Sequence, residues 1–320
     1  MFKNSKGWIT FFRIGFAIAA YGFIVLKLHR QGTDNILLAI GNFSITQGWP
    51  YLLAALLLMP LSWSIEAYKW KLALSEVERL RFVTAWKSVW YGVAAGFLTP
   101  NRVGDPFGRM VFISPENRGK AIVLGIWCGL SQLLATIFFG FAGLSLWFGI
   151  SHSLEELFGN TLYLMAFVEV LLLVTVVFLT IGSISKYLQR VPLLRRLLAG
   201  ESLSLKIKPI KSLKILGLSL LRYTVFSTQF ILLLICFGIE GELQLLYSGV
   251  FLSYLFAGVV PSFTVTEVVV RSGFAVAFIG LVDPNPVAIV AATLSIWLLN
   301  VTIPTVVAVW FPWFRSDKNA

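Results

Sequence analysis

The chain has 320 residues, of which 58% are hydrophobic and 13% are charged, and its mean hydropathy is +0.83. Ordinary soluble domains carry roughly 25% charged residues, so this composition excludes a soluble globular fold. The formal net charge of +11 comes from lysines and arginines that gather between apolar runs, which argues against a nucleic-acid-binding protein.

Six apolar segments are long enough to cross a bilayer, whose hydrocarbon core requires about 20 apolar residues per helix. In chain order they cover residues 8–28, 50–68, 121–148, 162–181, 215–237 and 287–311. Two further apolar stretches, residues 82–113 and 243–282, are each interrupted by a polar break that contains proline. The sequence therefore predicts an all-α integral membrane protein with one membrane domain over residues 1–320.

The charges of the loops predict how these segments are oriented. Lysine and arginine predominate at residues 69–81 and 186–214, whereas the loops near residues 155 and 240 carry glutamate without lysine or arginine. The positive-inside rule places the basic loops and both termini in the cytoplasm of a multi-pass protein of the plasma (inner) membrane. With that orientation each interrupted stretch must enter and leave on one side, so both are predicted to be re-entrant hairpins. An arrangement of eight full spans is the alternative.

The order of the segments repeats in the opposite orientation. Residues 1–150 and residues 155–312 each contain two spans, a hairpin and a third span, and the first set begins inside while the second begins outside. Inverted-topology repeats of this kind place broken helices from each half around a site at the bilayer midplane. We therefore expect the two polar breaks to meet.

The first break contains residues that stop one helix and start another. Pro100 cannot continue the incoming helix, Gly104 permits a tight or left-handed turn, and Asp105 before a proline is predicted to be an N-cap. Arg109 follows Asp105 by four residues. Ionisable residues at membrane depth are costly and tend to mark substrate paths. The candidate substrate-binding residues here are Thr99, Pro100, Asn101, Arg102, Gly104, Asp105 and Arg109.

The second break uses the same devices. Pro261 stops the incoming helix, and Thr264 and Glu267 have capping-box spacing, so a new helix should begin near residue 265. Arg271 follows Glu267 by four residues. The plain alternative is that both carboxylates are only caps and both arginines only their i,i+4 partners. The candidates in this break are Pro261, Thr264, Thr266, Glu267 and Arg271.

Other polar residues lie inside the predicted spans. Glu169 and Arg222 could form a supporting ion pair, whereas Glu66, near the cytoplasmic end of its span, is interpreted as snorkelling. The two cysteines lie inside apolar runs and the two histidines stand alone, so neither a metal nor a cofactor is predicted. Three residues are interpreted as interhelical hydrogen-bonding side chains: Gln132, Gln229 and Asn300.

The first break resembles a signature of the flippase-like transmembrane family that includes the membrane region of lysylphosphatidylglycerol synthases. The shared pattern is Thr-Pro, a basic residue, Gly, an acidic residue and then Arg, which here runs from Thr99 to Arg109. The stretch from Val260 to Glu267 is similar to the second signature, although residues 262–266 stand where the family usually has glycines. The resemblance implies transbilayer movement of lipids or lipid-linked headgroups.

We therefore expect a flippase-like or scramblase-like transporter, not an enzyme. Its substrate would bear phosphate, as an anionic phospholipid or a polyprenyl-phosphate-linked lipid does. The alternatives are an intramembrane enzyme that acts on a lipid carrier, and a non-transporting partner of a separate lipid-modifying synthase. The loop at residues 182–214 is too short to hold the synthase domain of bifunctional family members. Partnership with a separate synthase, or with further copies of the chain, stays open.

Overall fold

The computed structural model describes residues 22, 45–99, 102–151, 169, 175–176, 178, 207–260 and 264–310. Helices and short connections make up this part of the chain, with no strand in it, so the predicted all-α class is confirmed. The predicted spans at residues 8–28 and 162–181 lie almost wholly outside the described residues.

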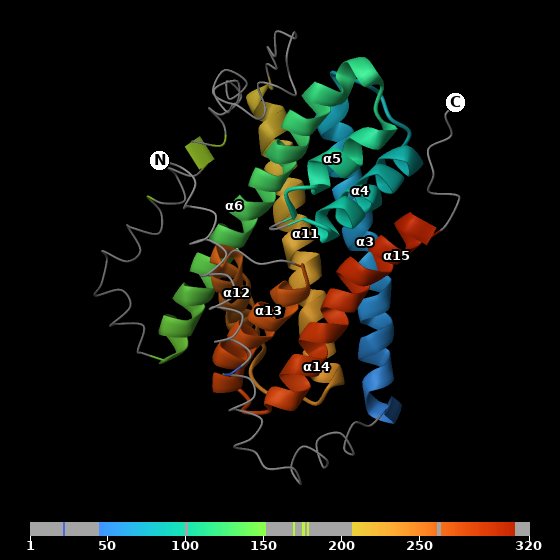
Figure 1. The fold of residues 1–320 in the computed structure, drawn as a ribbon. Helices are drawn as coiled ribbons and strands as arrows, with labels where there is room; N and C mark the ends of the chain where they lie inside the picture. Colours follow the sequence, from blue (N-terminus) through green and yellow to red (C-terminus); the bar gives the residue numbers. More distant parts are fainter. Residues whose placement is uncertain are drawn as a thin grey trace, which may run out of the picture.

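Four long apolar helices form the frame of the described structure (Figure 1). Each is long and apolar enough to cross a bilayer, and the shortest has 25 residues, about 37 Å at 1.5 Å per residue. They coincide with the predicted spans at residues 50–68, 121–148, 215–237 and 287–311. They are α3 (Ile45–Leu74), α6 (Arg118–Ser151), α11 (Pro209–Cys236), and a bent helix made of α14 (Pro286–Trp297), a π-helical segment (Leu298–Thr302) and α15 (Ile303–Trp310). The chain is a multi-pass membrane protein.

Two pairs of shorter helices pack against the four long ones. The first hairpin consists of α4 (Phe82–Phe97) and α5 (Asp105–Arg109), and the second consists of α12 (Leu243–Val259) and α13 (Thr264–Phe278). In Figure 1, the first hairpin lies toward the end of the bundle where α3 ends and α6 begins, and the second lies toward the opposite end. With at most 17 residues, each arm is shorter than a full span.

The first hairpin packs closely because glycines line the contact between its arms. A Cβ atom at Gly108 would lie 2.7 Å from Cβ of Ala95 and 2.8 Å from Cα of Gly92. A Cβ atom at Gly104 would lie 2.5 Å from the carbonyl oxygen of Ala95. Small residues four apart allow helix backbones to approach closely in membranes. Residues 92 and 96 on α4 and residues 104 and 108 on the returning arm have that spacing.

The turn of the first hairpin differs from the prediction in two details. The left-handed position is Arg102, with φ 55°, whereas Gly104 has φ −72° and is needed for its close approach to α4. The N-cap of α5 is Gly104, and Asp105 is the first helical residue and makes no cap hydrogen bond, so the predicted N-cap role of Asp105 is wrong. The hydroxyl of Thr99 instead accepts a hydrogen bond from the Gly104 amide at 2.8 Å.

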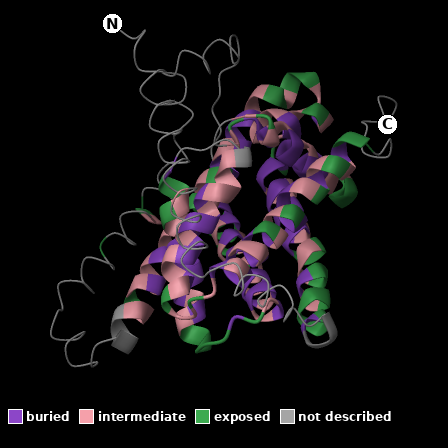
Figure 2. Ribbon diagram, turned by 60° about the horizontal axis from the view of Figure 1, so that its bottom comes forward, coloured by how far each residue is buried: buried purple, intermediate pink, exposed green. Residues whose placement is uncertain are grey.

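Buried residues gather where the helices face one another, and exposed residues lie on the outer faces (Figure 2). The outer face of α3 is rich in leucine, and the side chain of Leu57 is 65% exposed. Large exposed apolar faces are a liability in water and suit a helix that faces lipid. The core has one cluster around α11 to α14 that includes Leu234, Ile279 and Ile289, and another around α3, α4 and α6 that includes Trp70, Val89 and Leu124.

Candidate functional site

The tips of the two hairpins are joined by an ion pair between Arg102 and Glu267. Atoms Nη2 and Nε of Arg102 donate to Oε2 of Glu267 at 3.2 and 3.3 Å. The other oxygen of Glu267 pairs with Arg271, one turn further along α13. One carboxylate is therefore shared by two arginines, and this tip cluster of Arg102, Glu267 and Arg271 has one positive charge in excess. The predicted meeting of the two breaks occurs at these residues.

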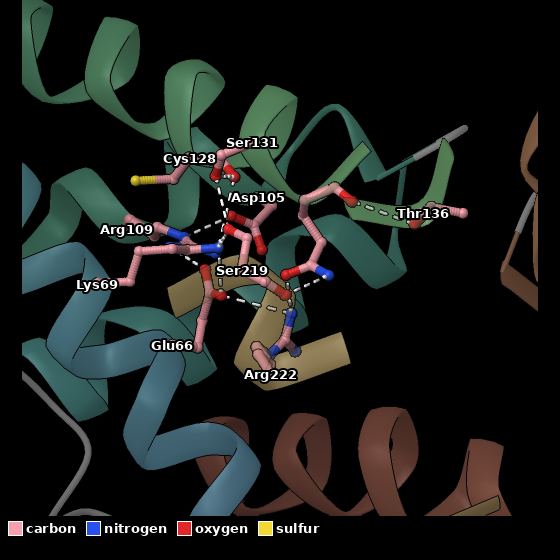
Figure 3. Close-up of polar contacts among 10 residues, drawn as sticks. Glu66, Lys69, Asp105, Arg109, Cys128, Ser131, Thr136, Ser219 and Arg222 are labelled. Atoms are coloured by element: carbon pink, nitrogen blue, oxygen red, sulfur yellow. Dashed lines mark hydrogen bonds and ion pairs between the residues drawn. The ribbon is translucent and has the colours of Figure 1, made fainter. Parts of the chain in front are cut away.

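A second group of charges lies around Glu66 of α3 (Figure 3). Glu66 pairs with Nζ of Lys69 at 2.7 Å, with Nη1 of Arg109 at 3.0 Å and with Nη1 of Arg222 at 3.4 Å. Arg109 also pairs with Asp105, four residues before it. Three cations therefore meet two carboxylates in this buried cluster, which again has one positive charge in excess.

The two clusters meet over α4 at Gly96. A Cβ atom at Gly96 would lie 3.2 Å from Cβ of Arg102 and 3.5 Å from Cβ of Asp105. One residue of each cluster therefore rests on the same glycine. The absence of a side chain at Gly96 lets the first hairpin hold both charges close together.

Arg109 is fixed from several sides and is 6% exposed. Its guanidinium lies over the ring of Trp70, 5.4 Å from the centroid. Its backbone oxygen accepts from the hydroxyl of Ser88 at 2.9 Å, and that hydroxyl accepts from Nε1 of Trp70 at 2.9 Å. Because Arg109 of α5 pairs with Glu66 of α3, it connects these two helices. The predicted i,i+4 pairs, at residues 105 and 109 and at residues 267 and 271, are both present.

The sequence pattern assigns Lys69 to the basic loop at residues 69–81, but the structure places it inside the bundle. Its side chain is 1% exposed and points into the bundle, where Nζ donates to the hydroxyl of Ser219 at 3.1 Å and to the backbone oxygen of Cys128 at 3.4 Å. The hydroxyls of Ser219 and Ser131 lie 2.8 Å apart. Lys69 therefore ties α3 to α6 and α11, and counting it among the loop charges is wrong.

Two further predictions, for the partner of Arg222 and for the exposure of Glu66, are also wrong. Glu169 is exposed, and Arg222 pairs instead with Glu66, so the suggested pair of Glu169 and Arg222 does not form. Glu66 is 3% exposed and therefore does not snorkel. Arg222 also donates to Oε1 of Gln132 at 3.4 Å and lies over the ring of Trp63, 4.9 Å from the centroid. The sequence does contain a signal for this cluster. Ser62, Glu66 and Lys69 have helical spacing, which puts all three polar residues on one face of an apolar helix and indicates that this face is buried.

The remaining predicted residues are placed as follows. Pro100, Asn101 and Pro261 lie outside the described residues. Helix α13 begins at Thr264, one residue before the expected start near residue 265, and Thr266 is half-buried in its first turn. The side chain of Thr264 lies outside the described part, so its capping role stays a prediction.

All three predicted interhelical amides tie helices together as expected. Gln229 of α11 donates to the backbone oxygen of Ala55 in α3 at 2.8 Å. Asn300, in the π-helical segment, donates to the side-chain oxygen of Gln229 at 2.8 Å. Gln132 of α6 donates to the backbone oxygen of Ser219 in α11 at 3.5 Å and accepts from Arg222 of the same helix at 3.4 Å.

The chemistry of the site is that of guanidinium groups and carboxylates. Within the described ranges, no group of three or more His, Cys, Asp or Glu residues is placed to hold a metal ion. Arginine presents a planar fork of donors that matches the oxygens of carboxylate and phosphate groups. The side chains of Arg102 and Arg271 are 33% and 25% exposed, against 20% for Arg222 and 8% for Arg109, so the tip cluster holds the two most accessible cations of the site.

The protein-family model described as lysylphosphatidylglycerol synthase TM region matches residues 12–308 of the chain. The match includes both hairpins and almost all of the four long helices. No curated protein matches the chain significantly.

Proposed function

Since the chain belongs to the lysylphosphatidylglycerol synthase transmembrane-region family, we propose that it moves a phosphate-bearing lipid or lipid-linked headgroup across the bilayer. The family points to work on membrane lipids. An anionic phospholipid and a polyprenyl-phosphate-linked lipid both carry the required group. The movement would be of the flippase or scramblase type.

The observation that carries this proposal is the tip cluster. Arg102 and Arg271 come from opposite hairpins, share one carboxylate and keep part of their side chains exposed. A surplus of positive charge beside lipid is stabilised by an anion, and phosphate is the anion that membrane lipids offer. A phosphate bound by both arginines would contact both hairpins. A movement of one hairpin relative to the other would therefore move the phosphate as well.

Transport is a better fit to these residues than catalysis. Each carboxylate of the two clusters is held by at least one arginine. A general acid or base must reach a proton of the substrate, and these carboxylates are turned toward arginines instead. We therefore propose that these carboxylates position arginines.

We further propose that both hairpins are re-entrant, with both termini in the cytoplasm of a plasma-membrane protein. The 16 residues of α4 extend about 24 Å, which is less than the bilayer core of about 30 Å. The two hairpins lie toward opposite ends of the bundle (Figure 1). Tips reached from opposite sides could meet near the midplane, as in transporters built from inverted repeats.

Cysteine labelling tests this topology. In a chain whose native cysteines are replaced, Arg79→Cys should react with a membrane-impermeant maleimide from the cytoplasmic side only, and Glu240→Cys from the outer side only. Both positions are exposed and flank the hairpins. Val103→Cys, at the tip of the first hairpin, should react from the outer side much more slowly than Glu240→Cys. Equal rates at the outer face would show that the first hairpin crosses the membrane completely.

Transport in liposomes tests the function. The wild-type chain should accelerate the movement of fluorescently labelled phosphatidylglycerol between leaflets. Arg102→Gln should slow it roughly tenfold or more, since a hydrogen bond to a charged group contributes about 1.5–3 kcal/mol. Lys214→Gln, an exposed residue of α11 with the same change of charge, is the matched control and should transport normally. Equal rates for the two variants would remove the tip cluster from the transport path.

A further inference from the structure

The carboxylate of Glu267 occupies the place that an anionic ligand of the tip cluster would need. One of its oxygens accepts from Arg102 at 3.2 and 3.3 Å, and the other pairs with Arg271. The side chain of Glu267 is 14% exposed, between two arginines that are 33% and 25% exposed. The two most accessible cations of the site are thus joined to an internal anion.

The buried cluster is arranged differently. Arg109 is held by two carboxylates, Asp105 and Glu66, and its side chain is 8% exposed. The side chain of Glu66 is 4% exposed, and displacing it would leave a charge deep in the bundle without its partner, which is strongly unfavourable. An incoming anion can therefore compete at Glu267 far more readily than at Glu66.

We propose that Glu267 is a specificity-determining residue that competes with the phosphate group of the substrate for Arg102 and Arg271. This inference rests on the proposed function and assigns a role to one residue of that site. Carboxylate and phosphate oxygens accept from the same guanidinium donors, so only one of the two anions can bind both arginines at a time. Neutral headgroups cannot displace the carboxylate, and a bound phosphate can be displaced by it again.

The same competition would control the contact between the hairpins. Arg102 has a left-handed backbone conformation, which is unfavourable for a residue with a Cβ atom, and its side chain reaches across to the second hairpin. When phosphate displaces Glu267 from Arg102, the ion pair that joins the two tips is broken. The backbone at Arg102 can then leave its left-handed conformation. Return of Glu267 to Arg102 would then release the phosphate and restore the contact.

Glu267→Gln separates this role from a merely structural one. The glutamine keeps the size of the side chain and removes the competing charge, so the affinity for phosphatidylglycerol in nanodiscs should rise about tenfold while transport slows because release is slower. Glu76→Gln removes the same charge from an exposed carboxylate that pairs with Lys211, and it should leave the affinity unchanged. Arg102→Gln should weaken binding because it removes half of the anion-binding pair.

Glu267→Asp is the second variant, should the glutamine variant not fold. Its shorter side chain keeps the charge but reaches both arginines poorly, so it should also bind phosphatidylglycerol more tightly than the wild type. Diacylglycerol is the neutral comparison, and inorganic phosphate the free anion. Tighter binding of phosphatidylglycerol supports a lipid headgroup, whereas tighter binding of inorganic phosphate alone overturns that assignment.

The results distinguish this inference from the proposed function. Equal or weaker binding by both Glu267 variants, with normal wild-type transport, overturns the competition and leaves transport in place. Tighter binding without transport by the wild type supports the competition and overturns the transporter. If no form of the chain binds phosphatidylglycerol in preference to diacylglycerol, both proposals are wrong.

Discussion

Replacing Glu66 by glutamine should lower the free energy of unfolding by about 3–5 kcal/mol, the range for breaking a buried ion pair. Glu66 is 3% exposed and is the carboxylate shared by Lys69, Arg109 and Arg222. Without its charge, the three cations keep Asp105 as the remaining carboxylate of the cluster, and Asp105 pairs with Arg109. Unfolding of the purified chain in bicelles, followed by steric trapping, would measure the change.

Glu76→Gln is the matched control for Glu66→Gln. Its side chain is 50% exposed and lies 3.5 Å from Nζ of Lys211, so its loss should cost no more than about 1 kcal/mol. A second comparison combines Glu66→Gln with Arg222→Gln. Removing one of the stranded cations should recover part of the lost stability. A cost for Glu66→Gln no larger than that of Glu76→Gln would show that the buried cluster does not depend on this carboxylate.

Gly108→Ala should lower the free energy of unfolding by about 1–3 kcal/mol, the usual range for overpacking a tightly packed site. The new methyl group would lie 2.7 Å from Cβ of Ala95 and 2.8 Å from Cα of Gly92, and backbone on α4 cannot move aside as a flexible side chain does. The arms of the first hairpin would be forced apart, and Arg109 would move away from Glu66. We therefore expect slower lipid transport as well as lower stability.

Gly129→Ala provides the comparison for Gly108→Ala. Gly129 lies in α6, is exposed, and has no atom within 4 Å of the position of a new Cβ. Alanine has the higher helix propensity, so this variant should be neutral or stabilising by up to about 1 kcal/mol. The same unfolding measurement serves both variants. Similar losses for the two would mean that the close packing of α4 and α5 is not the cause.

The carboxylate of Asp105 acts differently from what its sequence context suggests. Asp105 precedes a proline and has the pattern of an N-cap, but its side chain is turned to Arg109. The charge of a nearby arginine attracts a carboxylate more strongly than a backbone amide does. The helix start was therefore placed correctly from the sequence, whereas the partner of the side chain was not.

Several features of the protein are determined by the sequence alone. The lengths of the apolar runs set the four described long helices, because a bilayer requires about 20 apolar residues per span. Proline and the spacing of four residues set the breaks and the pairs of Asp105 with Arg109 and of Glu267 with Arg271. These features depend on neighbours within one or two turns of the chain, so local rules are sufficient to find them.

The tertiary structure alone decided which distant charges meet. Arg102 and Glu267 are 165 residues apart, and Glu66 and Arg109 are 43 apart. Such partners depend on which faces of the helices pack together and at what depth, and neither is set by the composition of a single segment. The buried position of Lys69 was hidden for the same reason. In a low-dielectric interior a charge must find a partner, and only the packed bundle determines which partner is within reach.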